Sequence, residues 1–235
     1  MTEMTARPNH TRGRWWAVPI LPFPWLLVAA SFGADSPAGI AVDPQKKLVT
    51  IDCKIAPRKL PNLDEVYPIE VVATFAAPKG QKAHETVVTF EARPSEIAKA
   101  VESLGLKPGA PASGEGAKAA GPEVKVSLLI AAADGKAARK LAIEKCLVDK
   151  KTGKAMPALK WYFTGSALKQ ADPEKPEKSY GADLTGTLIA LFPVTADTVF
   201  QTNLTMKDEP LLKLDTNTKA LPPEGTAVKL LIEAK

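Results

Sequence analysis

The sequence contains few of the residues that most often ligate metals. Its 235 residues include two histidines and two cysteines. His10 lies in a segment that we interpret below as a leader, so His84 is the single histidine of the remaining chain. One histidine excludes the common catalytic zinc sites that use two or three, and two cysteines are too few for an iron–sulfur cluster with four thiolate ligands. We therefore predict neither a metal centre nor a bound cofactor.

Dense acidic loops and segregated basic patches are also lacking. Calcium requires six or more oxygen ligands, and no loop carries acidic residues at that density. The formal net charge is +5, and it falls to +3 when the three arginines and the single glutamate of residues 1–30 are removed. Lysine and acidic residues are interspersed along the rest of the chain, which gives no indication of a nucleic-acid partner.

Long apolar runs are absent from the body of the chain, and the N-terminal segment stands out for that reason. Residues 1–14 are polar and basic, and residues 15–30 carry no charge and end in small side chains. This pattern is typical of an export signal. We predict a signal peptide over residues 1–30, cleaved after Ala30 or, as the second choice, after Gly33, and a location in the periplasm or cell envelope.

An uncleaved N-terminal anchor is the alternative to a cleaved leader, and it is the only membrane contact that we expect. The apolar run barely reaches the length of about 20 residues that a spanning helix needs. It also contains Pro19, Pro22 and Pro24, and proline removes backbone donors from a helix. The cleaved leader is therefore the favoured interpretation.

The rest of the chain has the length of one domain. Residues 31–46 are small, polar and proline-bearing, which indicates a linker, and residues 47–235 carry the domain. Strands are predicted where apolar residues alternate or form short runs, over residues 48–55, 67–76, 85–92, 124–130, 146–148, 159–163, 187–192, 199–204, 211–214 and 227–232. Turn residues predict two hairpins, one joining 67–76 to 85–92 and the other joining 146–148 to 159–163.

One segment has strong helical character. Residues 94–104 begin with a proline, which suits the first helical position. They place Ile97, Val101 and Leu104 at the spacing of a buried stripe. Gly105 then suits the left-handed residue that ends a helix.

Strands outnumber helices in this pattern. A short helix is predicted near residues 136–145, a mobile loop rich in small residues over 107–121, and a charged loop over 170–178. We predict a β-rich α+β fold, mainly an antiparallel sheet or sandwich, with the helix at about 94–104 packed on it.

His84 and Glu85 form the first candidate site. Because the pKa of histidine lies near neutrality, His84 is a candidate general base or metal ligand. The alternative, which we favour, is a histidine at a hairpin end that is hydrogen-bonded to its neighbours. Ser166 and Asp183 supply the residue types of a nucleophilic triad, but Gly165-Ser166 lacks the second glycine of a nucleophile elbow. No catalytic residue is therefore assigned.

Two tyrosines complete the candidate ligand-binding set. Along a strand, Trp161 and Phe163 share the core face and Tyr162 takes the other face. Tyr180 lies where the charged loop meets an apolar run. The candidate set is His84, Glu85, Tyr162, Ser166, Tyr180 and Asp183.

Cys53 and Cys146 are the two cysteines of the chain. An exported chain with an even number of cysteines is compatible with a disulfide. Cysteine is also among the most buried residue types as a free thiol, and Cys53 lies on the apolar face of its strand. Geometry decides between these alternatives and sequence does not, so both stay open.

These segments together resemble the YdjY-domain family of exported bacterial proteins. The matching motifs are Glu65-x-Tyr67, Gly80-x-Lys82-x-His84-Glu85, Pro94-Ser95, Leu104-Gly105-Leu106-Lys107-Pro108-Gly109, Trp161-x-Phe163-x-Gly165-Ser166, Tyr180-x-Ala182-Asp183 and Leu221-Pro222-Pro223-x-Gly225-Thr226-x-Val228. The resemblance covers about residues 49–232 and implies an envelope location and one compact domain. It supplies no catalytic residues, because the family has no established activity. Some relatives carry an adjoining cysteine-rich segment, which this chain lacks.

Three functions remain open at this point. The favoured one is an exported, non-enzymatic binding or structural module whose partner protein or envelope component is unknown. The first alternative is an envelope ligand-binding domain or hydrolase-like enzyme with a pocket around His84, Glu85, Ser166 and Asp183. The second, an accessory domain to an electron-transfer partner, is implied by the resemblance alone.

Overall fold

Strands dominate the structure, which is a computed structural model describing residues 1, 38–133, 137–174 and 176–235. Residues 2–30 of the predicted leader and the first part of the predicted linker lie outside the described residues. The strands are β1 (Ile40–Asp43), β2 (Leu48–Ile55), β3 (Val71–Phe75), β4 (Val88–Phe90), β5 (Glu123–Ile130), β6 (Arg139–Ala142), β7 (Leu147–Asp149), β8 (Trp161–Phe163), β9 (Leu168–Gln170), β10 (Lys178–Tyr180), β11 (Thr187–Ala190), β12 (Phe200–Thr202), β13 (Leu214–Thr216) and β14 (Ala227–Ala234). The helices are α1 (Pro94–Glu102) and α2 (Gly181–Thr185), with 3₁₀ turns η1 (Ala83–Glu85) and η2 (Ile143–Cys146).

Eight of these strands close into a barrel, in the order β2, β14, β5, β8, β12, β11, β3 and β4. Pairing of β4 with β2 completes the ring, while β1 extends from β2 and β6 from β5. The pairs β3–β4 and β11–β12 are parallel and the other barrel pairs are antiparallel. The β-rich prediction with few helices is confirmed, but a closed mixed barrel replaces the predicted antiparallel sheet or sandwich.

Buried side chains of the barrel strands form the core, as the diameter of an eight-stranded barrel allows. Burial alternates along β2, where Ile51 is buried and Asp52 is exposed. The rings of Phe163 and Phe200 pack with centroids 5.4 Å apart. Strand β11 is buried along its whole length, as predicted for a strand covered on both faces.

The first predicted hairpin is wrong, because β3 and β4 are parallel. Both strands exist, but residues 76–87 carry the chain back to the end of the barrel where β3 begins. The Glu70 N–H donates to the Glu85 carbonyl at 3.1 Å, and the Val87 N–H donates to the Val72 carbonyl at 3.2 Å. The proline and glycine of this connection mark a turn, but a turn signal does not fix the direction of the next strand.

The second predicted hairpin is also wrong, because β7 does not pair with β8. Strand β7 pairs with β13 outside the barrel. The turn at Asp149 forms as predicted, with the Gly153 N–H donating to the Asp149 carbonyl at 2.7 Å, but it returns only to a bridge between Val148 and Ala155. Strand β8 instead pairs with β12 and β5.

Helix α1 confirms the main helical prediction. Ile97 and Val101 are fully buried, Leu104 packs partly buried against the core, and Gly105 has φ +88° in the left-handed region. The other expected helix is wrong, because β6 and η2 occupy the described part of residues 136–145. Part of the predicted linker is strand β1, which pairs with β2.

The predicted loop at 107–121 is held against the barrel. The Ala112 N–H donates to Gln201 Oε1 at 2.7 Å, and Gln201 Nε2 donates back to the Ala112 carbonyl at 2.8 Å. The Gly109 N–H donates to the Phe163 carbonyl at 3.0 Å. The loop is therefore irregular in conformation but tied to β8 and β12.

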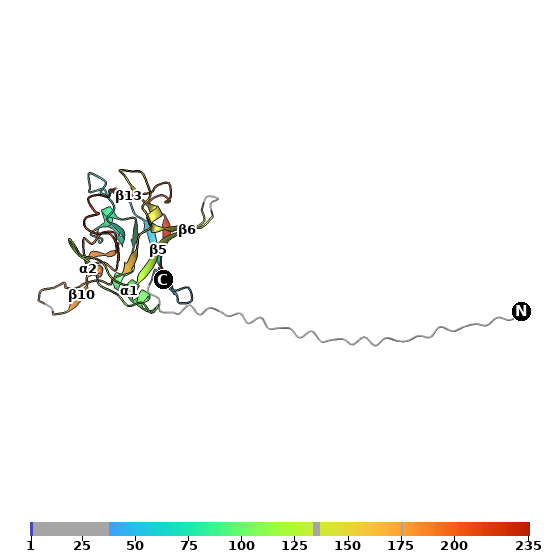
Figure 1. Cartoon of the computed structure of the whole chain (residues 1–235), viewed down its shortest axis with the longest axis horizontal. Helices are drawn as coiled ribbons and strands as arrows, with labels where there is room; N and C mark the ends of the chain where they lie inside the picture. The colour runs from blue at the N-terminus through green and yellow to red at the C-terminus, as the bar shows by residue number, and fades with distance from the viewer. Residues whose placement is uncertain (2–37, 134–136, 175) are drawn as a thin grey trace. The chain divides into compact units, whose positions relative to one another are not determined.

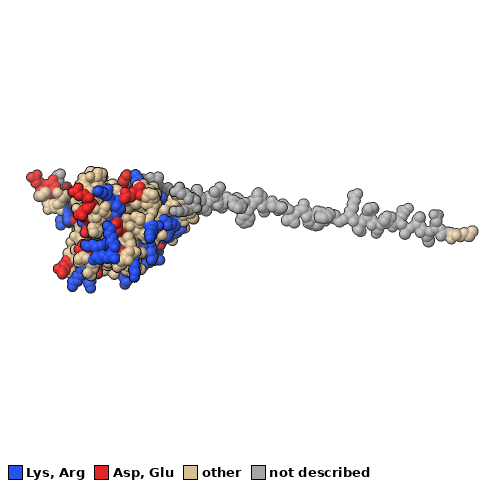
Figure 2. All heavy atoms as spheres, turned by 90° about the horizontal axis from the view of Figure 1, so that it is seen from above, with Lys and Arg blue, Asp and Glu red and all other residues tan. Residues whose placement is uncertain are grey.

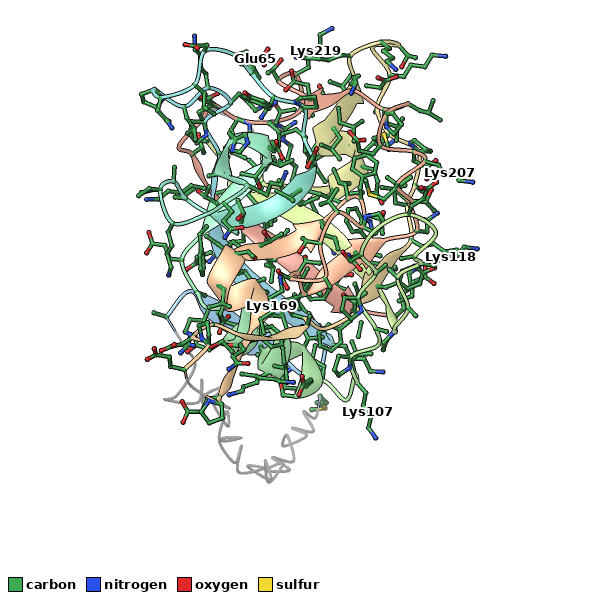
Figure 3. The ribbon with its side chains drawn as sticks, turned by 90° about the vertical axis from the view of Figure 1, so that its left-hand side faces the viewer. Glu65, Lys107, Lys118, Lys169, Lys207 and Lys219 are labelled. Atoms are coloured by element: carbon green, nitrogen blue, oxygen red, sulfur yellow. The ribbon has the colours of Figure 1, made fainter. Side chains whose placement is uncertain are left out.

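The two α-helices lie together at one end of the barrel. Figure 1 shows α1, α2 and the β10 hairpin at this end and β13 at the opposite end. In Figure 3, Lys107 marks the helical end, and Glu65 and Lys219 mark the other. The sequence-predicted site residues are distributed between these two ends.

Candidate functional site

His84 and Glu85 lie toward the β13 end of the barrel. Arg58 fixes them there, because its guanidinium donates to the His84 carbonyl at 3.2 Å and to Asp215 of β13 at 2.9 Å. The same guanidinium donates to the Tyr67 carbonyl at 2.5 Å. The Tyr67 and His84 rings meet edge to face, with centroids 5.1 Å apart.

Glu85 belongs to a cluster of four charged or titratable side chains, Glu70, Lys82, His84 and Glu85, which we call the Lys82 cluster. Lys82 Nζ lies 2.7 Å from Glu70 Oε2 and 2.6 Å from Glu85 Oε2. His84 Nε2 lies 3.1 Å from the other Glu85 oxygen. The ammonium group therefore occupies the space between two carboxylates, where a metal ion would otherwise have to bind.

The electrostatics of the Lys82 cluster follow from burial and from the sharing of one ammonium by two acids. Burial raises the pKa of Glu85, the Glu70 carboxylate raises it further, and the hydrogen bond from Lys82 only partly offsets both. Burial alone would lower the pKa of Lys82, but its hydrogen bonds to Glu70 and Glu85 outweigh that effect and raise it. The cluster thus favours a charged lysine beside a Glu85 carboxyl that retains its proton more readily than usual.

Asp183 lies at the helical end of the barrel and accepts hydrogen bonds from the first turn of α1. Its Oδ1 accepts the Ser95 N–H at 2.8 Å, and its Oδ2 accepts the Ser95 hydroxyl at 2.6 Å. Arg93 contributes a more exposed ion pair at 3.2 Å. A carboxylate at this position satisfies a free N–H of the first helical turn and complements the positive end of the helix dipole.

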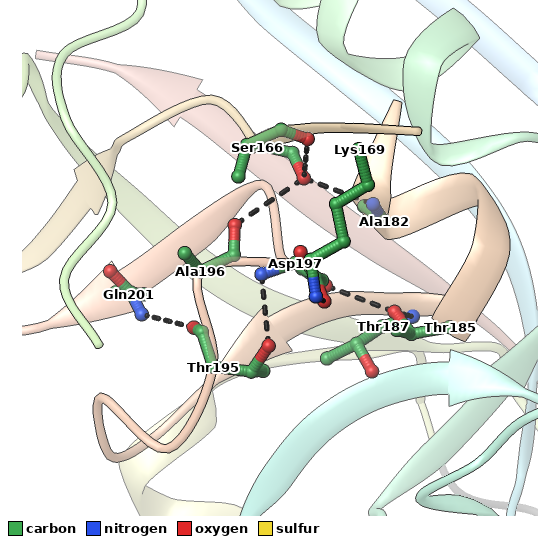
Figure 4. A network of polar contacts seen from close by, with 10 residues as sticks. Ser166, Lys169, Ala182, Thr185, Thr187, Thr195, Ala196, Asp197 and Gln201 are labelled. Atoms are coloured by element: carbon green, nitrogen blue, oxygen red, sulfur yellow. Dashed lines mark hydrogen bonds and ion pairs between the residues drawn. The ribbon is translucent and has the colours of Figure 1, made fainter. Parts of the chain in front are cut away.

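Ser166 supports α2 in a similar way. Its hydroxyl oxygen accepts the Ala182 N–H at 2.9 Å and lies 3.4 Å from the carbonyls of Ala167 and Ala196 (Figure 4). Ser166 is thus held by backbone groups, in a different part of the fold from His84.

Asp197 belongs to the same network of polar contacts in Figure 4. It is buried and pairs with Lys169, while its Oδ1 has no hydrogen-bond partner among the described residues. That oxygen would lie 2.5 Å from a Cβ atom at Gly181, and the Ala167 carbonyl oxygen would lie 2.8 Å from it. Glycine is therefore required at the start of α2 by close packing.

Tyr162 and the two cysteines belong neither to the Lys82 cluster nor to the contacts of Ser166 and Asp183 with the helices. Tyr162 is half-buried on β8, opposite the buried Trp161 and Phe163, as predicted. The structure contains Cys53 and Cys146 as buried free thiols. Burial raises the pKa of each thiol to about 12, which keeps both protonated at neutral pH.

A pocket of about 480 Å³ opens at the helical end, and we call it the α1–α2 pocket. Residues of four segments line it: Phe75 and Lys79 at the end of β3, Arg93 and Ser95 at the start of α1, Lys178, Ser179 and Tyr180 of β10, and Asp183 and Leu184 of α2. Of the predicted site residues, Tyr180 and Asp183 are in this lining. They therefore lie at the opposite end of the barrel from His84 and Glu85.

The lining of the α1–α2 pocket combines apolar surface with positive charge. Lys79 Nζ lies 3.9 Å from the centre of the Phe75 ring, and Leu184 is 42% exposed. Burial raises the pKa of Tyr180 to about 12, Glu102 and Asp183 add to this, and a hydrogen bond with the Ser166 backbone opposes it. The phenol therefore remains protonated and able to donate at neutral pH.

A larger hollow of about 1290 Å³ lies over the outer face of β2, β14 and β5. Small side chains such as Ala76, Ala92, Ala131 and Ala227 form much of its lining, and an exposed ion pair between Asp52 and Lys229 lies at its surface. Polar and charged residues line much of the rest of the hollow, namely Asp52, Lys54, Thr89, Glu91, Arg93, Glu96 and Lys229.

Several residues of these clusters were missed from the sequence. Glu70, Arg58 and Asp197 have no local signal, because their side-chain partners lie between 9 and 157 residues away along the chain. Lys82 and Glu85 are three residues apart, a spacing that brings side chains together on a helical turn, and this signal was available. Within the described ranges, no group of three or more His, Cys, Asp or Glu side chains is arranged to hold a metal. No helix in the described part of the chain is long and apolar enough to cross a membrane.

Comparison with known proteins gives one match. The family model described as the YdjY domain matches residues 40–233, a range that begins with β1 and ends in β14. No curated protein and no solved structure matches the chain. The matched range includes seven barrel strands in full, β14 up to residue 233, both α-helices and all residues of the Lys82 cluster and the α1–α2 pocket. The chain therefore belongs to the YdjY-domain family.

Proposed function

We propose that this protein is an exported binding module of the bacterial cell envelope, not a catalyst, and that it holds its ligand or partner in the α1–α2 pocket. The proposal of export is supported by the basic, then apolar, then small-residue pattern of residues 1–30. The observation that carries the proposal of binding is the pocket itself. Four separate chain segments converge on it with apolar surface and polar groups, which is the usual composition of a ligand site.

The engagement of the candidate catalytic groups also supports a binding function. Asp183 accepts a backbone N–H of the first turn of α1, Ser166 accepts a backbone N–H of α2, and Glu85 pairs with Lys82. Each group is thus committed to stabilising the fold. A nucleophile and its base must lie within hydrogen-bonding distance of each other, whereas Ser166 and His84 bond to different partners at opposite ends of the barrel.

The enzymatic alternative would centre on the Lys82 cluster. One feature favours it, because a buried glutamate with a raised pKa beside a histidine is a common acid–base arrangement. Under that alternative, His84→Ala abolishes turnover or ligand binding without unfolding the domain. Under the binding-module proposal, the same variant retains wild-type binding, since His84 lies away from the α1–α2 pocket.

Filling the pocket tests the proposal directly. Ser179→Trp places a large side chain in the lining, and Leu168→Trp adds the same side chain at an exposed position of the same hairpin outside it. Wild-type and variant proteins are recovered from an exporting host, incubated with envelope extract, and analysed by native mass spectrometry for retained small molecules or proteins. We expect wild type and Leu168→Trp to retain the same species and Ser179→Trp to lose it. Equal retention by a folded Ser179→Trp protein would exclude this pocket as the binding site.

A further inference from the structure

We infer that the α1–α2 pocket recognises its ligand through an anionic group, a carboxylate or a phosphate, attached to an apolar body. This inference rests on the proposed binding function and specifies the chemistry of the same site.

The charge of the pocket lining is unbalanced. Lys79, Arg93 and Lys178 contribute three positive charges, and Asp183 contributes one negative charge. Lys79 and Lys178 have no carboxylate partner within the part of the chain that the structure describes. Glu102 influences Tyr180 from outside the lining. A ligand in the pocket therefore meets two unneutralised ammonium groups.

The one carboxylate of the lining is already engaged. Both oxygens of Asp183 accept hydrogen bonds from Ser95, and its side chain is 12% exposed. A bound cation would have to compete with these bonds and approach three positive side chains. An anion, by contrast, meets the ammonium groups and the remaining guanidinium N–H groups of Arg93, of which one nitrogen is used on Asp183.

The rest of the lining selects for an apolar body beside the anion. Phe75 forms the base under Lys79, and the Tyr180 ring and the exposed Leu184 side chain complete the apolar surface. A volume of about 480 Å³ lies within the range of small-molecule sites. Exposed lysines are common on proteins, and charges of both signs cover the face shown in Figure 2. This position differs in that unpaired cations border a hollow with an aromatic base.

A matched set of small probes tests the inference on the protein as recovered from an exporting host. Benzoate and phenyl phosphate carry an anion on a ring, benzamide is an uncharged analogue of benzoate, and inorganic phosphate lacks the ring. Binding is followed through the backbone amide signals of Ser95, Ser179 and Leu184 in NMR titrations at low salt. Because each exposed charge pair changes affinity by about twofold to fivefold, we expect benzoate and phenyl phosphate to bind about tenfold more tightly than benzamide.

Lysine variants separate the pocket from general surface charge. Lys79→Met and Lys178→Met should each weaken the binding of benzoate by about threefold without changing that of benzamide. Lys107→Met removes an exposed lysine outside the pocket (Figure 3) and should change neither.

Four outcomes would overturn the inference. Equal affinity for benzamide and benzoate, or an equal effect of Lys107→Met, would remove the anion requirement. Inorganic phosphate binding as tightly as phenyl phosphate would remove the apolar requirement. Absence of shifts at the pocket residues with every probe would refute the inference as a whole. The proposed binding function is decided separately by Ser179→Trp and Leu168→Trp, which involve none of these probes.

Discussion

Removal of the Asp183 carboxylate should destabilise the protein, because the first turn of α1 loses its hydrogen-bond acceptor. The lost acceptor for the Ser95 N–H at 2.8 Å corresponds to a helix cap worth about 1 kcal/mol. The bond from the Ser95 hydroxyl at 2.6 Å is made to a charged group and adds about 1.5 kcal/mol. Arg93 is 66% exposed, so its ion pair adds little. We therefore expect Asp183→Ala to lower the free energy of unfolding by about 2.5 kcal/mol.

Two further variants make this prediction specific. Asp183→Asn keeps an acceptor for the Ser95 N–H but loses the charge that complements the helix dipole, so we expect a loss of about 1 kcal/mol. Asp64→Ala removes an exposed aspartate for which no partner is seen in the described structure, and it should stay within about 0.5 kcal/mol of wild type. Urea denaturation followed by circular dichroism measures all three. The reasoning fails if Asp183→Ala lies within about 0.5 kcal/mol of wild type, or if the asparagine variant is as unstable as the alanine variant.

Three other predictions follow from the packing and electrostatics. Gly181→Ala should destabilise the protein by about 1–3 kcal/mol or more, because the new methyl group meets Asp197 Oδ1 and the Ala167 carbonyl. The control Gly153→Ala, where nothing lies within 4 Å, should lose only about 1 kcal/mol from its left-handed backbone. Similar urea midpoints for the two variants would contradict the packing argument. The folded state raises the pKa of Glu85, so above the ordinary glutamate pKa it binds more protons than the unfolded state. Wild type should therefore lose stability relative to Glu85→Gln as pH rises from the ordinary pKa through the raised one. Wild type that keeps or gains stability relative to Glu85→Gln over this range would argue against the prediction. Both cysteines should resist iodoacetamide at pH 8 in the folded protein and react fully in urea, since their thiols are buried with pKa values of about 12; an intact mass that rises by two hydrogens on reduction would instead reveal a disulfide.

Local patterns in the sequence predicted local structure correctly. Alternation gave strand β2 its observed bounds, and proline, apolar spacing and glycine together located α1. These features depend on interactions between residues a few positions apart, which a single chain segment already contains. The two aromatic residues assigned to the core face of β8, Trp161 and Phe163, are buried for the same reason.

The pairing of strands could not be obtained in this way. Residues 76–87 contain turn signals, yet they lead to a parallel neighbour, because the direction of β4 is set by its contacts with both β3 and β2. Closure of the barrel depends on that one pairing, between segments that local periodicity cannot join. The loop at 107–121 is likewise fixed by Gln201, about ninety residues away.

The sequence by itself determined the family motifs, the strand-rich character of the chain and the candidate residues His84, Glu85, Ser166, Tyr180 and Asp183. Only the tertiary structure decided which contacts these residues make, because hydrogen bonds and charge pairs form between segments distant in the chain. In the folded protein, Asp183 bonds to the first turn of α1, Ser166 bonds to the first turn of α2, and Glu85 pairs with Lys82. The tertiary structure also brings Lys79, Arg93 and Lys178 around one pocket, since barrel closure and the packing of α1 against α2 join three surfaces that the sequence keeps apart.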